Sequence, residues 1–107
     1  MKYSIEFTDT AKSDLRNIAF YIAEESKDKD IAKKFVHELT DQCVQLEDFP
    51  MSGSVPNDRT LASLGYRFLV HKEYLIFYSV NELNGKVYVN AVFNAKKDYL
   101  RVLKKLT

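Results

Sequence analysis

The stretch that decides the fold is Leu64–Phe93, LGYRFLVHKEYLIFYSVNELNGKVYVNAVF. It is dense in the aromatic and β-branched residues that suit a pleated surface. Two short polar breaks divide it, and the second ends in Asn84-Gly85, a pair that tolerates the positive φ angles of tight hairpin turns. We therefore expect three sequential antiparallel strands, at Leu64–Val70, Tyr74–Val80 and Lys86–Phe93.

Polar residues with possible chemistry collect on the same stretch. Alternate side chains of a strand point to the same face, so Arg67 and His71 are expected to share one face of the first strand. The candidates on this stretch are Arg67, His71, Lys72, Tyr74 and Tyr78.

The residues before the sheet predict a short strand and a first amphipathic helix. Lys2–Phe7 alternates polar and apolar residues, as a half-buried strand does. Thr8 or Asp9 can then cap a helix whose apolar residues recur at helical spacing, and Phe20 and Tyr21 widen that apolar stripe. The polar segment Glu24–Asp30 is expected to be a turn. The apolar stripe consists of Ala11, Leu15, Ile18 and Ile22.

A second amphipathic helix follows, with Asp28 or Asp30 as its cap. Phe49 is expected to extend its apolar stripe, and Pro50 to end the helix. Two such helices with a short connection form a helical hairpin that must bury both stripes on another surface, and the sheet supplies it. The second stripe consists of Ala32, Phe35, Leu39, Cys43 and Leu46.

The remaining segments complete one domain over residues 1–107. Met51–Thr60 contains Gly53 and Pro56 and is expected to be one extended loop. Asn94–Thr107 carries five Lys/Arg against one Asp, which fits a short helix or a tail. The fold class is therefore α+β: an N-terminal strand and a helical hairpin packed on an antiparallel β-meander, with a basic C-terminal helix or tail.

Composition excludes several classes of protein. A single cysteine, Cys43, allows no internal disulfide framework and no zinc cluster, and a core thiol is the expected role for it. No apolar run approaches the ~20 residues of a membrane span. The N-terminus lacks the apolar core of a signal peptide, so the protein is expected to be cytoplasmic. Residues 1–50 carry 7 Lys/Arg against 11 Asp/Glu and residues 51–107 carry 9 against 4, so a basic half follows an acidic one.

The order of these elements, with the residues that fill them, resembles the RelE/ParE superfamily of toxins from type II toxin–antitoxin modules. The paired helices ending in Phe49-Pro50 and Gly53, followed by Gly65-Tyr66-Arg67 and Ile76-Phe77-Tyr78, resemble the ParE or plasmid-stabilisation branch. The similar segments are FTDTAKSDLRNIAFYIAEE, AKKFVHELTDQCVQLEDFPMSG, LGYRFLVHKEYLIFYSV and VYVNAVFNAKKDYLRVL.

The resemblance implies a growth-inhibiting toxin, a cognate antitoxin as partner and no cofactor or metal. ParE-like members bind DNA gyrase and have no hydrolytic chemistry, whereas RelE-like members cleave mRNA on the ribosome. A degenerate, non-toxic protein that only binds an antitoxin is a third possibility. Residues expected to bind the target or the antitoxin are Arg67, His71, Lys72, Tyr74, Lys96, Lys97 and Arg101.

Under the ribonuclease hypothesis, the resemblance assigns catalysis to Arg67, Lys96, Lys97 and Tyr99. Metal-free cleavage needs a base for the 2′-hydroxyl, cations for the phosphorane and an acid for the leaving oxygen. Ribonuclease relatives carry an arginine after the tyrosine of the next strand, where this chain has Leu75, so the set is incomplete.

Each candidate also has a structural interpretation. Arg67 can equally hydrogen-bond a carbonyl or pair with an acidic residue of the helical hairpin. His71 and Lys72 fit a solvated turn, and His37 a surface position. Tyr74 and Tyr78 fit core or cross-strand packing.

Overall fold

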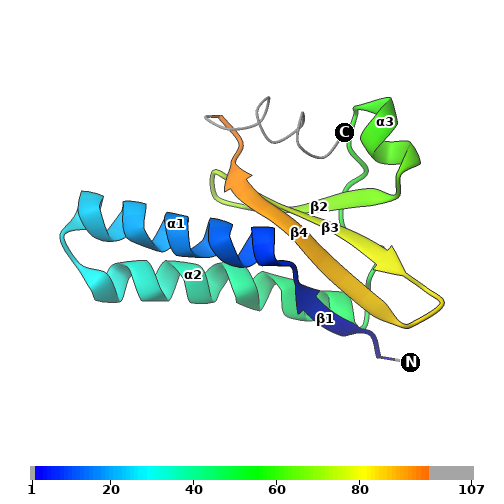
Figure 1. Cartoon of the computed structure of the whole chain (residues 1–107), viewed down its shortest axis with the longest axis horizontal. Helices are drawn as coiled ribbons and strands as arrows, with labels where there is room; N and C mark the ends of the chain where they lie inside the picture. Colours follow the sequence, from blue (N-terminus) through cyan, green and yellow to red (C-terminus); the bar gives the residue numbers. More distant parts are fainter. Residues whose placement is uncertain (1, 97–107) are drawn as a thin grey trace.

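The computed structural model describes residues 2–96 as a four-stranded sheet with a helical hairpin packed against one face (Figure 1). The outer ends of the two long helices extend beyond the sheet. The predicted α+β architecture is confirmed. The elements are β1 (Ser4–Phe7), α1 (Asp9–Ser26), α2 (Lys29–Val44), the 3-10 turn η1 (Gln45–Glu47), α3 (Arg59–Ser63), β2 (Tyr66–His71), β3 (Tyr74–Asn81) and β4 (Lys86–Asn94).

The strands lie in the order β1-β4-β3-β2. β2, β3 and β4 form the predicted antiparallel meander, while β1 runs parallel to β4, with Ser4 opposite Lys86 and Phe7 opposite Val89. Lys86 Nζ also lies 2.8 Å from Glu6 Oε1, and that hydrogen bond raises the pKa of the Lys86 ammonium. Because β1 and β2 stand at the two ends of the strand order, they form the edges of the sheet.

Side-chain caps start both long helices. The hydroxyl of Thr8 accepts the N–H of Ala11 at 3.1 Å, and the carboxylate of Asp28 accepts the N–H of Asp30 at 2.8 Å. The predicted turn Glu24–Asp30 is too long, because α1 continues to Ser26 and α2 starts at Lys29. Lys27, with φ of 58°, reverses the chain between them.

Apolar side chains cover both faces of the sheet. β3 alternates strictly, so Ile76 and Tyr78 face the helical hairpin while Leu75 and Phe77 face the other side, where Leu61 of α3 packs. The register shifts between Phe77 and Tyr78, opposite β4. The helix-side core contains Ala11, Ile18, Leu39, Cys43, Leu46, Ile76, Tyr78, Val87, Val89 and Val92.

That register shift is a β-bulge, and it changes which face β4 presents. Tyr78 pairs with Val89 and Phe77 with Ala91, so Asn90 is an extra residue between two paired positions. Before the bulge Val89 faces the helices, and after it Ala91 faces away from them. Asn90 Nδ2 donates to the Ser79 hydroxyl at 3.0 Å and to the Tyr88 carbonyl at 3.1 Å, which satisfies its amide at the irregular position.

Some predicted boundaries and burials are wrong. α2 ends at Val44 and passes into η1, and Phe49 is 67% exposed rather than buried on the helix stripe. Phe20 is 71% exposed, because two residues after the buried Ile18 a helix points nearly the opposite way. The predicted extended loop Met51–Thr60 ends in α3, which Asp58 caps. The predicted helix or tail Asn94–Thr107 overlaps β4, which ends at Asn94, and residues 97–107 lie outside the described residues.

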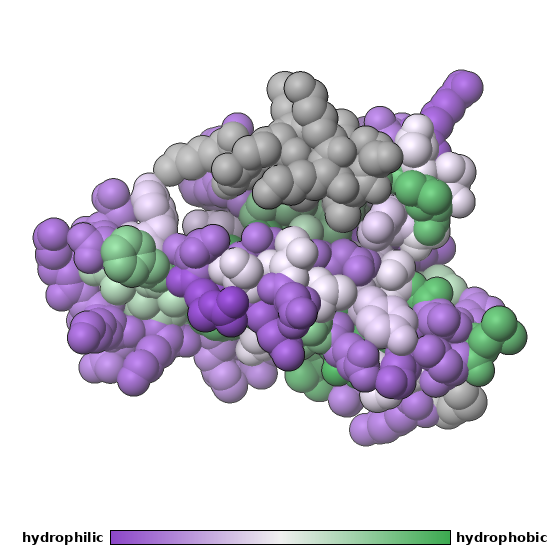
Figure 2. Space-filling view, in the orientation of Figure 1, coloured by the Kyte–Doolittle hydropathy of each residue, from purple (hydrophilic) through white to green (hydrophobic). Residues whose placement is uncertain are grey.

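The surface in the same orientation is largely hydrophilic over the helical hairpin, with separate apolar patches (Figure 2). Within residues 2–96, no helix combines the length and the hydropathy that membrane crossing requires.

Candidate functional site

Arg67 fastens the loop after η1 to strand β2. Its Nη1 donates to the carbonyl oxygens of Met51, at 3.2 Å, and Gly53, at 3.0 Å. Ser54 and Phe68 exchange two backbone hydrogen bonds of 2.9 Å each, which adds one pair of residues to the outer edge of β2. Of the two structural interpretations of Arg67, the one that fits this geometry is a hydrogen bond to backbone carbonyls.

Gly53 is enclosed at the centre of this loop. Its N–H donates to the hydroxyl of Tyr78 at 2.9 Å, and the Tyr78 side chain is fully buried. Burial raises the pKa of this phenol, although the Gly53 N–H and Arg67 partly oppose that shift. A Cβ on Gly53 would lie 2.5 Å from Tyr78 Oη and 2.8 Å from the Phe68 carbonyl oxygen, so only glycine fits. Tyr78 is a core residue, as expected.

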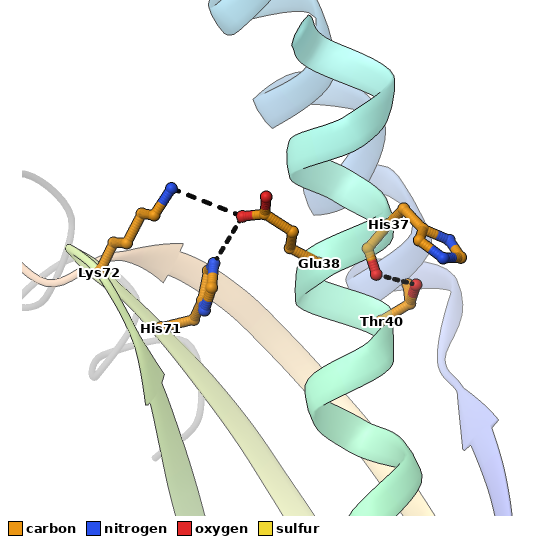
Figure 3. Close-up of polar contacts among 5 residues, drawn as sticks. All are labelled: His37, Glu38, Thr40, His71 and Lys72. Carbon is orange, nitrogen blue, oxygen red and sulfur yellow. Dashed lines mark hydrogen bonds and ion pairs between the residues drawn. The ribbon is translucent and has the colours of Figure 1, made fainter. Parts of the chain in front are cut away.

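A second cluster joins the β2–β3 turn to α2 (Figure 3). His71 Nε2 lies 3.0 Å from Glu38 Oε1, and Lys72 Nζ lies 3.5 Å from the same oxygen. Because a carboxylate only accepts, Nε2 carries the proton. The hydrogen bond from His71 is the largest of the effects that lower the pKa of Glu38, and Lys72 adds to it. Lys72 Nζ also lies 5.4 Å from the Phe35 ring centroid.

This cluster corrects the interpretation of His71 as part of a solvated turn, whereas Lys72 does lie in a turn with its side chain 63% exposed. The His71 side chain is only 16% exposed and packs 5.7 Å from the Phe35 ring. Lys72 adopts φ of 55°, which is unusual for a residue with a side chain. Tyr74 packs edge-on against Phe35 at 5.3 Å, which fits the packing role expected for it. By contrast His37 lies on the surface, as expected, 3.5 Å from Asp41.

Lys96 follows β4 at the sheet end that holds the β2–β3 turn. The Lys96 N–H donates to the Asn94 side chain at 2.9 Å, and the Ala95 N–H donates to the Glu73 carbonyl at 2.8 Å. His71, Tyr74 and Asn94 lie in one row across the sheet, and Arg67 lies four residues away along β2. At ~3.3 Å per residue, about 13 Å along the strands separates Arg67 from that row. Lys97, Tyr99 and Arg101 lie outside the described residues.

Of the four residues that the ribonuclease hypothesis assigns to catalysis, the structure describes two, and these two lie apart. Arg67 is engaged by carbonyls, and Lys96 belongs to the far end of the sheet. Leu75, where relatives carry an arginine, packs into the apolar cluster on the face away from the helices. Among residues 2–96, no group of three or more His, Cys, Asp or Glu side chains is placed to hold a metal ion.

Two hydrogen-bonded partnerships cannot be read from the sequence. Glu38 was not singled out, because its partner His71 is 33 residues away and only the docking of α2 brings them together. The sequence places Gly53 only in a loop. The available signal that its surroundings are tight was that the residue is a glycine. Cys43 is 2% exposed and burial raises the pKa of its thiol to about 12, which fits the predicted core role.

The family model of the ParE toxin of type II toxin–antitoxin system, parDE, matches residues 5–99, which include every element described above except the first residue of β1. The chain belongs to the ParE toxin family. It is therefore a toxin of the type II class, as the sequence resemblance implied. No curated protein matches the chain.

Solved structures share the fold of this ParE-family toxin. A chain from the chromosomal ParDE system of P. aeruginosa superimposes with a TM-score of 0.72 at 16% identity, over 87% of this chain and 96% of that one. The RelBE2 toxin–antitoxin complex from Mycobacterium tuberculosis gives 0.60 at 21% identity, over 88% and 99%. A mutant of the E. coli toxin RelE in the free state gives 0.62 at 15% identity, over 100% of both chains.

Proposed function

We propose that this ParE-family toxin arrests growth in the cytoplasm by binding DNA gyrase, without hydrolytic chemistry, and that a cognate antitoxin neutralises it. The observation that carries the proposal is the position of Arg67. Its Nη1 donates to the Met51 and Gly53 carbonyls and holds a loop in place. A guanidinium used in this way is a structural group rather than a ligand for a phosphorane.

The chemistry of RNA cleavage supports the same choice. Cleavage needs several polar groups within hydrogen-bond reach of one phosphate. Arg67 lies about 13 Å along the strands from the row formed by His71, Tyr74 and Asn94. Lys96 follows Asn94 at that end of the sheet. Leu75 supplies no charge on the strand between them. A toxin that acts by binding needs none of these groups assembled.

An antitoxin partner is supported by the exposed apolar surface. A contiguous patch of large apolar side chains in water is typical of a surface that a partner covers. The sequence has 7 Tyr and 7 Phe, and several of the bulky apolar residues are indeed outside the core. The most exposed are Phe20, Phe49, Leu64, Val70 and Leu83.

The experiment is controlled expression of the toxin in a bacterial host, with parallel measurements that distinguish gyrase from mRNA as the target. Expression should arrest growth and induce the SOS response, while transcripts on ribosomes remain intact. Purified toxin should inhibit supercoiling by purified gyrase, and a co-expressed antitoxin should restore growth. Fragmented transcripts without SOS induction would contradict the gyrase target and favour a RelE-like ribonuclease. Unimpaired growth would favour a non-toxic protein that only binds an antitoxin.

A further inference from the structure

The turn between β3 and β4 is held by its own asparagine side chains. The side-chain oxygen of Asn81 accepts the N–H groups of Leu83 and Asn84, at 3.1 and 3.2 Å. Gly85 follows, and Lys86 is already the first residue of β4. Asn84 is exposed, so water reaches its side chain. The turn therefore presents an accessible amide on an ordered backbone.

Both ends of the Asn84 carboxamide are bound. Its Oδ1 accepts the Lys86 N–H at 3.1 Å, and its Nδ2 donates to the Tyr88 hydroxyl at 3.1 Å. A bond from an asparagine oxygen to the N–H two residues later is an Asx turn, which folds the side chain back over the peptide bond that follows it. The carboxamide carbon of Asn84 is thereby held beside the nitrogen of Gly85.

The groups around this amide are those that an internal attack on it requires. The Gly85 nitrogen can close a five-membered ring, and glycine carries no side chain that hinders the approach. Within residues 2–96 the Gly85 N–H donates no hydrogen bond. The Lys86 N–H contacts the oxygen on which negative charge develops, and the Tyr88 hydroxyl contacts the nitrogen that leaves. Groups held together in this way react without the entropy cost of meeting.

We propose that the Asn84-Gly85 turn is a self-modification site, at which the toxin converts Asn84 to aspartate or isoaspartate without an enzyme. The Gly85 nitrogen loses its proton to a base in solution and bonds to the carboxamide carbon Cγ. The Cγ–Nδ2 bond breaks, and the nitrogen leaves as ammonia with a proton from the Tyr88 hydroxyl, which the solvent restores. Water then opens the cyclic imide at either carbonyl. The net reaction consumes one water and releases one ammonia.

The reaction has a structural consequence for β1. Isoaspartate carries the main chain through the former side chain, which inserts one methylene between positions 84 and 85. The Ser4 N–H donates to the Gly85 carbonyl at 3.0 Å, and Ser4 also pairs with Lys86, so β1 begins beside this turn (Figure 1). The inserted methylene displaces that carbonyl and loosens β1 from β4. The folded toxin thus has a chemically limited lifetime, whichever target it binds.

The test incubates the purified full-length toxin at pH 8 and 37 °C. Peptide mass mapping follows acid formation at each asparagine, and labelling by an isoaspartate methyltransferase identifies the isomer. Asn84 should convert about ten-fold faster than Asn57 and Asn90, because Asp58 and Ala91 carry side chains beside the attacking nitrogen. Conversion of Asn84 at the rate of these two would overturn the proposal.

Tyr88→Phe separates an assisted site from the ordinary reactivity of an Asn-Gly pair. It removes only the hydroxyl, and conversion of Asn84 should slow by about ten-fold as the proton donor is lost. The matched control is Tyr66→Phe, at a tyrosine of β2 that is also partly exposed, and it should change the rate less than about two-fold. Circular dichroism should report an intact fold for both variants. An unchanged rate in Tyr88→Phe would overturn the assignment of this site.

Hydrogen exchange tests the consequence for β1. In toxin that has converted, amide exchange over Ser4–Phe7 should accelerate relative to fresh toxin. Asn84→Gln is the control, because glutamine would have to close a larger ring, and the same incubation should leave its exchange unchanged. Exchange in β1 that stays the same after conversion would overturn the limit on lifetime.

Discussion

The hydroxyl of Tyr78 accepts the backbone N–H of Gly53 at 2.9 Å inside the core, 25 residues away in sequence. This bond connects the loop after the helical hairpin with the central strand β3. Arg67, on the neighbouring strand, holds the same loop from its carbonyl side. The loop is thus attached through both polar groups of one residue.

Gly53→Ala should destabilise the protein. The new Cβ would lie 2.8 Å from the Phe68 carbonyl oxygen, and backbone cannot move away as a flexible side chain can. Overpacking of this kind costs roughly 1–3 kcal/mol, measurable by urea unfolding. Gly65→Ala is the control, because its Cβ meets open space and only the φ of 85° is unfavourable. A smaller loss for Gly53→Ala than for Gly65→Ala would contradict the steric argument.

Arg67→Ala should lower stability and loosen the loop. The part-buried Gly53 carbonyl loses its charged donor, and such a loss costs about 1–3 kcal/mol. Amide hydrogen exchange at Gly53 and Ser54 should accelerate, whereas exchange in α1 should change little. Arg59→Ala, at an exposed position in α3, is the control. An unchanged exchange rate at Gly53 would show that Arg67 does not hold the loop.

The thiol of Cys43 should be inert in the folded protein. It is 2% exposed, and burial raises its pKa to about 12, so almost no thiolate forms at neutral pH. Ellman's reagent should react with it rapidly only in denaturant, and the slow reaction in water should follow the fraction of unfolded protein. Stoichiometric labelling of the native protein within minutes would contradict this placement.

Glu38 should contribute to acid-dependent stability. The hydrogen bond from His71, with help from Lys72, lowers the pKa of Glu38 below its usual 4.5. A group with a lowered folded pKa stabilises the protein above its unfolded pKa, and this contribution disappears as the pH falls through the folded value. Urea unfolding should therefore show Glu38→Gln to be less stable than wild type at pH 6, with the difference shrinking below pH 4. Glu25→Gln is the exposed control, and a difference independent of pH would exclude this role for Glu38.

The sequence predicted the architecture better than its details. Apolar periodicity and the Asn84-Gly85 turn located three strands to within a few residues, because each signal is local. α3 was missed because five residues are too few to show a period. The bulge at Asn90 was also unpredictable, since it depends on the register between β3 and β4. The apolar stripes of the two helices predict that Phe20 and Phe49 are buried, and both are exposed.

The contacts of the candidate site were predicted less well, because they also depend on residues that are distant in sequence. A hydrogen bond from Arg67 to a carbonyl was one of the interpretations, but nothing local identified Gly53 as its partner. The charged neighbours of His71 in the sequence predict a solvated turn. The contacts of His71 are Glu38 and Phe35 of α2, which only the docked helix brings within reach. Long-range partners decide the roles of these polar residues.

The parallel pairing of β1 with β4 has a consequence for synthesis of the toxin. Ser4 pairs with Lys86 and Phe7 with Val89, so the first strand to leave the ribosome lacks its neighbour until almost the whole chain has been translated. Among the strands, α1 packs chiefly against β4, so this contact with the sheet also forms late. Pairings this distant in sequence are slow to form. A chain truncated before Lys86 therefore lacks β4, the strand that pairs with β1. Interrupted translation should leave such a toxin without its complete sheet.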